Sequence, residues 1–165
     1  MLTYETLDTP DGPFTVVEAA STVVAAGWST DAHELLARSR HRGEAADPGA
    51  VASADAVRAY YTGDADAVAK VRIGPAGTDF RMRVWDALRA IPAGETRTYG
   101  EVAAALGTPN ASRAVGAACG ANAVALFIPC HRVTGANGAL TGFAWGVGVK
   151  RSLLARETSA RRAGE

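Results

Sequence analysis

The chain has 165 residues, 48% of them hydrophobic and 21% charged, a composition typical of a globular protein with one domain or two small lobes. Its longest charge-free runs, 114–130 and 133–149, have 17 residues each and fall short of the ~20 apolar residues that a membrane helix needs. The acidic start carries no secretory signal, and two cysteines form no metal-ligand cluster, so we expect a cytoplasmic protein without metal or cofactor.

The formal net charge is zero, but the charges are unevenly divided along the chain. Residues 1–80 hold 6 Lys/Arg against 12 Asp/Glu, whereas residues 81–165 hold 11 against 5. This asymmetry favours a second half that binds a polyanion such as nucleic acid. Two solvated halves that attract each other explain it equally well.

Residues 1–76 are predicted to form an α/β lobe with a small antiparallel sheet. Alternating apolar residues and turn signals predict strands at 2–6, 14–17 and 23–28. The small polar segment 39–54 is predicted to be a loop, and the spacing of Val57, Tyr60 and Tyr61 indicates a helix. The run Gly-Pro-Ala-Gly at 74–77 marks the lobe boundary.

The second lobe, 77–158, is predicted to be mainly helical. Thr78 or Asp79 can cap a helix that Pro92 ends, with Trp85 and Met82 among its core residues. We expect a disordered tail over 159–165.

Two further short helices follow in this lobe. Thr98 and Glu101 form a capping box before a helix that Gly107 ends, and a connection at 108–110 leads to an alanine-rich helix at 111–120. A short helix, a tight turn and a second helix indicate a helix-turn-helix, although helix pairs also occur in proteins that never bind nucleic acid.

Beyond these helices, Ala123 to Ile128 forms an apolar run that is predicted to be extended and buried, and Pro129 then stiffens the approach to Cys130. His131 and Arg132 place cationic groups beside this cysteine, which favours a thiolate over a packed thiol. Cys119 lies among small residues without such neighbours, and we interpret it as a buried structural residue.

Taken together, these stretches make the chain resemble the O6-alkylguanine-DNA alkyltransferases, also called methylated-DNA–protein-cysteine methyltransferases. The resemblance covers 77–157 closely. The first 76 residues match the family only in their general pattern, and the corresponding lobe is ribonuclease-H-like in the family. The residues that carry it are Phe80, Val84-Trp85, Thr98-Tyr99, Arg113-Ala114-Val115-Gly116, Asn122, Ile128-Pro129-Cys130-His131-Arg132-Val133, Gly142-Phe143-Ala144-Trp145-Gly146 and Glu157.

The resemblance implies that Cys130 accepts the alkyl group. Displacement at the alkyl carbon requires a thiolate. His131 would take the thiol proton through a water, and Glu157 would orient the imidazole and balance its charge. Because nothing in the motif expels an alkyl group from sulfur, each molecule is expected to react once.

The resemblance also implies a pocket for the flipped base. Tyr99 would donate to a purine ring nitrogen and offset the charge that develops on the leaving group. The backbone carbonyls of Cys130 and Val133 would accept hydrogen bonds from the exocyclic amine of the purine, and the Ala144 amide would contact O6. Phe143 would lie near this pocket. On the residues alone, Tyr99 is equally a core aromatic at a helix start.

The resemblance implies that the helix at 111–120 is the DNA-binding helix. By resemblance, Arg113 fills the space that the flipped nucleotide leaves, and its neighbours Ala111, Ser112 and Ala114 let the helix lie close in the minor groove. Asn122 would brace the turn between this helix and the cysteine. Without the resemblance, Arg113 is a solvated charge or a phosphate contact and Asn122 a helix cap.

Two positions depart from the family pattern. Position 143 is Phe where members usually carry Tyr, so a hydroxyl near the pocket is missing. Position 123 is Ala where Pro often follows the Asn, so the loop before the cysteine has less stiffness.

The function expected from this resemblance is repair of O6-alkylguanine in double-stranded DNA, with O4-alkylthymine, cooperative binding and the range of alkyl groups left open. We expect a monomer in which the second lobe carries the chemistry. The alternatives are a lesion-binding protein without transfer activity, a cysteine hydrolase and a plain DNA-binding regulator. Cys130 argues against the first, and no sequence feature marks an oxyanion site for the second.

Overall fold

The computed structural model describes residues 1–164, and the chain divides into two compact units. The first unit contains Met1–Ala76 together with Ala123–Phe127. The second contains Gly77–Asn122 and the chain from Ile128 onward. The sequence analysis placed segment 123–127 in the second lobe, whereas its contacts assign it to the first unit.

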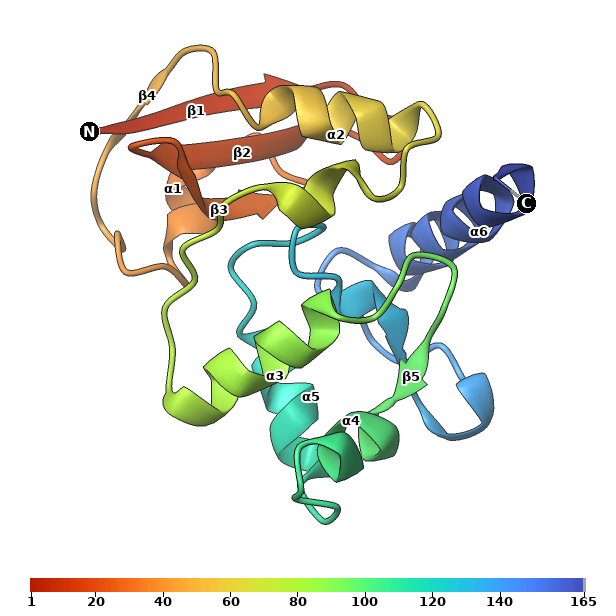
Figure 1. Ribbon diagram of the computed structural model, residues 1–165. Coiled ribbons are helices and arrows are strands. Elements are labelled where there is room, and N and C mark those ends of the chain that lie inside the picture. Colours follow the sequence, from red (N-terminus) through yellow and green to blue (C-terminus); the bar gives the residue numbers. More distant parts are fainter. Residues whose placement is uncertain (165) are drawn as a thin grey trace. The chain divides into compact units, whose positions relative to one another are not determined.

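The first unit is built on a four-stranded sheet with strand order β3-β2-β1-β4 (Figure 1). Strands β1 (Leu2–Leu7), β2 (Phe14–Ala19) and β3 (Thr22–Gly27) are antiparallel neighbours. Ala20 and Ser21 connect β2 to β3 with positive φ angles of 49° and 66°, as expected in a tight hairpin turn. Strand β4 (Ala46–Pro48) pairs with β1 in parallel, so the predictions of a wholly antiparallel sheet and of a loop over 39–54 were wrong for β4.

Three short helices complete the first unit: α1 (Ala32–Leu36), α2 (Ala54–Tyr61) and the 3-10 helix η1 (Ala67–Lys70). The predicted helix around Val57 and Tyr60 is α2, and both side chains are fully buried. The buried Glu18 carboxylate accepts hydrogen bonds from the Ser53 amide and hydroxyl at the start of α2. A carboxylate at this end of a helix satisfies an amide that has no partner within the helix.

The second unit contains three helices that pack together, α3 (Asp79–Arg89), α4 (Tyr99–Ala105) and α5 (Ser112–Gly120) (Figure 1). Helix α3 buries Val84, Trp85 and Leu88, as its apolar spacing predicts, whereas Met82 is only half-buried. The Trp85 indole Nε1 donates to the Ala118 carbonyl of α5 at 2.9 Å. This bond fixes α5 against α3 and confirms Trp85 as a core residue.

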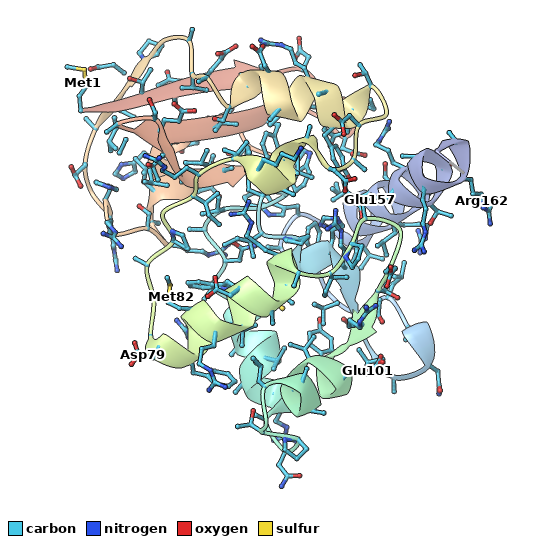
Figure 2. All side chains as sticks on the ribbon, in the orientation of Figure 1. Met1, Asp79, Met82, Glu101, Glu157 and Arg162 are labelled. Carbon is cyan, nitrogen blue, oxygen red and sulfur yellow. The ribbon has the colours of Figure 1, made fainter. Side chains whose placement is uncertain are left out.

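The predicted capping box is present at the start of α4. The Thr98 hydroxyl accepts from the Glu101 amide at 3.0 Å, and the Glu101 carboxylate accepts from the Thr98 amide at 2.9 Å. Glu101 is labelled at this position in Figure 2. Gly107, with φ +77°, follows the helix, and α4 and α5 form the predicted helix pair. The box sets the first turn of α4, on which Tyr99 lies.

The remainder of the second unit carries the cysteine segment and a long C-terminal helix. Strand β5 (Arg97–Thr98) pairs in parallel with β6 (Val133–Thr134), which follows the 3-10 helix η2 (Cys130–Arg132); η3 (Ala136–Gly138) and α6 (Val147–Ala163) come next. Helix α6 continues through 159–163, so the prediction of a disordered tail was wrong for these residues. The exposed Arg162 lies on this last stretch (Figure 2). Across residues 1–164, no helix is both long and apolar enough to span a membrane.

The predicted extended, buried segment before Cys130 joins the first unit. The Ala26 amide donates to the Ala123 carbonyl at 2.9 Å, and the Ala125 amide donates to the Ala26 carbonyl at 3.1 Å. The backbone is not extended throughout, because Leu126 has a φ of 72°. Segment 123–127 is flanked by Asn122 and Ile128, which both belong to the second unit.

The capping box gives a first prediction, on stability. Replacing Thr98 by Ala removes the hydroxyl that accepts the Glu101 amide, and loss of such a cap costs about 1 kcal/mol in the free energy of unfolding. Urea unfolding followed by circular dichroism measures this change. Thr96→Ala, at an exposed position two residues earlier, is the matched control and should leave the midpoint unchanged. Equal midpoints for the two variants would contradict the role of the cap.

Candidate active site

Cys130 begins η2, directly after Pro129, and its side chain is only 8% exposed. The Asn122 amide nitrogen Nδ2 donates to the Ile128 carbonyl at 3.0 Å and to the Cys130 Sγ at 3.3 Å. The first bond closes the two ends of segment 123–127. The second aims a donor at the sulfur, a contact that favours negative charge on it. The sequence analysis predicted the bracing role of Asn122 but missed its contact with sulfur.

A buried ion network lies beside the cysteine. The His131 Nε2 and the Glu157 Oε2 are 2.7 Å apart, and the Arg132 Nε donates to the Glu157 Oε1 at 2.8 Å. The Arg132 Nη1 also donates to the Ile91 carbonyl at 2.7 Å. Glu157, labelled on α6 in Figure 2, and His131 are both fully buried. The structure therefore brings Glu157 of α6 to His131, which follows Cys130 directly on η2.

The guanidinium of Arg132 has a different charge partner from the one that the sequence suggested. Its proximity in sequence made it a cationic neighbour of the sulfur, whereas the structure pairs its guanidinium with Glu157. A buried guanidinium needs a counter-charge, and the carboxylate of α6 provides it. Its charge is thus compensated within the network.

The state of Glu157 determines which nitrogen of His131 can act as a base. Burial opposes ionisation of Glu157, but His131 and Arg132 outweigh it and lower the pKa of this carboxyl from 4.5 to about 2. An ionised Glu157 can only accept, so His131 donates through Nε2 and the neutral ring has its lone pair on Nδ1. Nδ1 is buried and has no hydrogen-bond partner among residues 1–164. Nδ1 is therefore the ring nitrogen at which a neutral His131 can accept a proton.

Tyr99 lies at the start of α4 and faces α5. Its ring carbons are 3.9 Å and 4.0 Å from the point where a Cβ on Gly116 would lie, and its hydroxyl is 2.9 Å from the Thr141 hydroxyl. Burial raises the pKa of Tyr99, and the charges of Cys119 and Cys130 raise it further, so the hydroxyl remains protonated at neutral pH. Thr141 is a contact that the sequence analysis missed, because 42 residues separate it from Tyr99.

Two further groups lie within electrostatic range of Cys130. Cys119 is half-buried rather than buried as predicted, and desolvation together with the charge of Cys130 raises its pKa to about 12. Lys150 is 1% exposed and interacts electrostatically with both cysteines. Lys150 was not predicted from the sequence, although its spacing from Leu153 and Glu157 places all three on the buried face of α6.

The predicted DNA-binding residues lie on and beside α5. Val115 and Ala118 face the core, whereas Arg113 and Ala114 are exposed, and Ala111 and Ser112 are half-buried at the helix start. The exposed side of α5 thus combines one arginine with very small side chains. Such a surface would let the backbone of α5 lie close to the floor of a nucleic-acid groove.

The loop and strand after Cys130 hold the other predicted pocket residues. Val133 is buried, and its amide donates to the Cys130 carbonyl, which keeps a second lone pair for another donor. Phe143 is half-buried, and Ala144 is exposed. Within residues 1–164, no cluster of three His, Cys, Asp or Glu side chains could hold a metal ion.

The second unit thus combines a helix pair of the helix-turn-helix kind with a buried cysteine that stands next to a histidine held by a carboxylate, an arrangement that fits a DNA-binding protein with a reactive thiol. A family model described as 6-O-methylguanine DNA methyltransferase, DNA binding domain, matches residues 79–159. A Mycobacterium tuberculosis protein named methylated-DNA–protein-cysteine methyltransferase is 44% identical over 160 residues, which cover 96% of this chain and 94% of the relative. The chain belongs to the methylated-DNA–protein-cysteine methyltransferase family.

Solved structures agree with this assignment. The crystal structure of the M. tuberculosis O6-methylguanine methyltransferase matches with a TM-score of 0.80 and 42% identity, over 97% of this chain and 94% of that one. The M. tuberculosis protein in complex with DNA also matches with a TM-score of 0.80, at 41% identity over 96% of this chain and 94% of that one. These matches confirm the predicted mixed α/β fold.

The lowered pKa of Glu157 gives a prediction for acid stability. Its ionisation stabilises the fold above pH 4.5, and this contribution is lost as the pH falls from 4.5 to about 2, because the unfolded chain binds the proton first. The shift corresponds to about 3 kcal/mol. Unfolding free energies measured from pH 7 to pH 2 should show this loss in the original protein and not in Glu157→Gln.

Glu95→Gln is the control for this measurement. Glu95 is partly exposed, its ion pairs with Arg97 and Arg161 are screened by solvent, and its loss should leave the acid transition unchanged. At pH 7, Glu157→Gln should itself be destabilised by about 3–5 kcal/mol, because Arg132 is left buried without its counter-charge. A Glu157→Gln variant with the original acid profile would refute the assignment.

Proposed function

We propose that Cys130 is the acceptor of the alkyl group and that the second unit carries the whole reaction. The observation that supports this most is the position of the sulfur, 3.3 Å from the Asn122 amide and next in the chain to a histidine held by a buried carboxylate. A donor to the sulfur and an oriented base are the two features that activate a thiol.

The first step is removal of the thiol proton. The S–H bond of Cys130 breaks, and the proton passes through a water to the His131 Nδ1, which carries the lone pair of the neutral ring. Glu157 accepts from the imidazolium that forms and stabilises it, while Arg132 keeps the carboxylate ionised. Asn122 donates to the thiolate.

The second step is displacement at the alkyl carbon of O6-alkylguanine. A bond forms between the sulfur and this carbon, the bond from carbon to O6 breaks, and its electron pair moves onto the purine. The Tyr99 hydroxyl, which remains protonated, donates to a ring nitrogen and stabilises this charge. The purine takes up a proton and becomes guanine, and the thioether on Cys130 ends the reaction after one turnover.

Recognition of DNA is assigned to α5. Its small exposed side chains allow close approach in the minor groove, and Arg113 takes the space that the extruded nucleotide leaves. The pocket is completed by the backbone of Cys130, Val133 and Ala144, with Phe143 beside it. A single molecule acts on each lesion, and contacts to phosphates make binding dependent on salt and largely independent of sequence.

The acceptor is tested with a duplex that contains one O6-methylguanine. After incubation, mass spectrometry of the intact protein should show one added methyl group, and that of its peptides should place it on Cys130. Cys130→Ser should gain nothing and leave the lesion in the DNA. Cys119→Ser is the matched control and should react at the original rate, because burial keeps that thiol protonated. Methylation that persists in Cys130→Ser would exclude the mechanism.

The role of Arg113 is tested by comparing duplex and single-stranded substrates. Extruding a base from a duplex costs a few kcal/mol, so Arg113→Ala should slow methyl transfer from the duplex about tenfold or more. Transfer from a single-stranded oligonucleotide should fall much less, since no stacked base must be replaced. Arg162→Ala, at the exposed end of α6, serves as the control. An equal loss on both substrates would assign Arg113 to general DNA binding instead.

A further inference from the structure

Tyr99, the proposed donor to the purine, has a partner that the mechanism above does not use. Its hydroxyl lies 2.9 Å from the hydroxyl of Thr141, within hydrogen-bond distance, and both side chains are half-buried. Thr141 lies in the loop between η3 and α6, 42 residues after Tyr99. A contact between residues so far apart in the sequence depends on the elements that carry them.

The small sheet of β5 and β6 brings the two segments together. The strands pair in parallel register, so the residues that follow them, Tyr99 and Gly135, leave the sheet at the same end. The Gly135 amide donates to the Ala139 carbonyl at 2.8 Å, and η3 packs against β5. The chain therefore turns back on Gly135 just before it reaches Thr141.

Gly135 provides the space that the Thr141 side chain occupies. Its backbone has φ −74° and ψ 178°, a conformation open to any residue, so glycine is not needed here for conformational freedom. A Cβ at this position would lie 2.8 Å from the Thr141 Cγ2, whereas carbon atoms pack at about 3.5–4.0 Å. Because Cγ2 and Oγ1 of Thr141 turn together about χ1, this contact also sets the direction of the hydroxyl.

The role of Tyr99 decides which hydroxyl donates during the reaction. Each hydroxyl has one proton to donate and lone pairs with which to accept. When Tyr99 donates its proton to the purine nitrogen, its oxygen can bond Thr141 only as an acceptor. A phenol that accepts a hydrogen bond is a stronger donor, because consecutive hydrogen bonds polarise one another. Burial and the charges of Cys119 and Cys130 raise the pKa of Tyr99, and the bond with Thr141 opposes this rise.

We propose that Thr141 is a positioning residue for alkyl transfer, whose hydroxyl donates to the Tyr99 oxygen and leaves the Tyr99 proton directed to the purine ring nitrogen. The inference rests on the proposed function and deepens it. The Tyr99 ring faces Gly116 of α5 while Thr141 holds its hydroxyl, so the donor is in place before the charge develops. A donor that does not have to reorganise stabilises a transition state most.

The first test measures single-turnover methyl transfer from a duplex with one O6-methylguanine, at increasing DNA concentration. Thr141→Val keeps the methyl group that packs on Gly135 and removes the hydroxyl. The maximal rate should fall about three- to tenfold, the effect of one hydrogen bond, and the DNA concentration at half-maximal rate should stay the same. Thr141→Ser keeps the hydroxyl and should keep the rate. Thr96→Val, at an exposed position of the same unit, is the matched control.

A second comparison separates positioning from a structural role. Tyr99→Phe removes the donor itself and should slow transfer about a hundredfold. If Thr141 acts through that hydroxyl, adding Thr141→Val to Tyr99→Phe should cause no further loss. Equal losses with and without the Tyr99 hydroxyl would overturn the proposal, and so would an unchanged maximal rate in Thr141→Val.

The contact with Gly135 allows a test that keeps both hydroxyls. Gly135→Ala adds a methyl group 2.8 Å from the Thr141 Cγ2, so the threonine has to turn and its hydroxyl has to move. The maximal rate should fall as it does in Thr141→Val. Adding Thr141→Ser removes Cγ2, and the rate of this double variant should recover. A double variant as slow as Gly135→Ala would contradict the link between this contact and the hydroxyl.

A measurement without DNA tests the hydroxyl pair itself. In protein that is isotope-labelled at the tyrosine Cζ, the NMR signal of Tyr99 is the one missing from Tyr99→Phe. A bond from Thr141 stabilises the ionised phenol, so Thr141→Val should raise the midpoint at which this signal titrates, and Thr141→Ser should not. The signals of Tyr4, Tyr60 and Tyr61, which belong to the first unit, are internal references. An unchanged midpoint in Thr141→Val would refute the pair.

The proposal and the proposed function can therefore fail separately. If the midpoint of Tyr99 rises as expected but no methyl group moves from DNA to Cys130, the hydroxyl pair stands and the proposed function is wrong. If methyl transfer occurs and Thr141→Val changes neither the rate nor the midpoint, the function stands and Thr141 has no part in it.

Discussion

The second unit depends on one buried carboxylate held between two nitrogen-bearing side chains. Glu157 comes from α6, its partners His131 and Arg132 come from η2, and Arg132 also donates to the carbonyl of Ile91 beyond the end of α3. Three segments therefore meet at the ion pair of Glu157 and Arg132. An ion without access to water must keep its partners, so this arrangement tolerates little displacement of any of them. The same contact selects the nitrogen through which His131 donates, and so links the stability of the unit to the chemistry of the neighbouring thiol.

Asn122 connects that chemistry to the helix assigned to DNA. Asn122 lies two residues after the end of α5, and its side-chain amide donates to both the carbonyl of Ile128 and the sulfur of Cys130. Residues 123–127 belong to the first unit, and these two bonds hold the sulfur in place although the chain is interrupted there. The exposed side of α5 and the nucleophile are thereby connected through one short, fully buried contact. Ala123, which stands where the family often has proline, is itself buried and accepts a backbone hydrogen bond from Ala26. The stiffness that a proline would supply is replaced here by hydrogen bonds and packing.

The charges of this unit are paired by the fold rather than by proximity in sequence. Arg132 is two residues from Cys130, yet its guanidinium pairs with Glu157, 25 residues further along the chain, and the same carboxylate holds His131. The asymmetry of charge between the two halves of the sequence does not predict these pairings. It describes the net charge of each half, which depends mainly on exposed side chains, and not the partners of the few charged groups in the interior.

The sequence alone determined those features that depend on residues a few positions apart. The capping box of Thr98 and Glu101, the apolar stripe of α3 and the motif around Cys130 are local, because helix hydrogen bonds and caps span three or four residues. Tertiary structure decided the rest. Arg132 pairs with Glu157 across 25 residues, β4 pairs with β1 in parallel, and α6 continues through 159–163 with Lys150 on its buried face. These outcomes depend on which side chains face one another after packing, and the order of residues along a chain does not specify those directions.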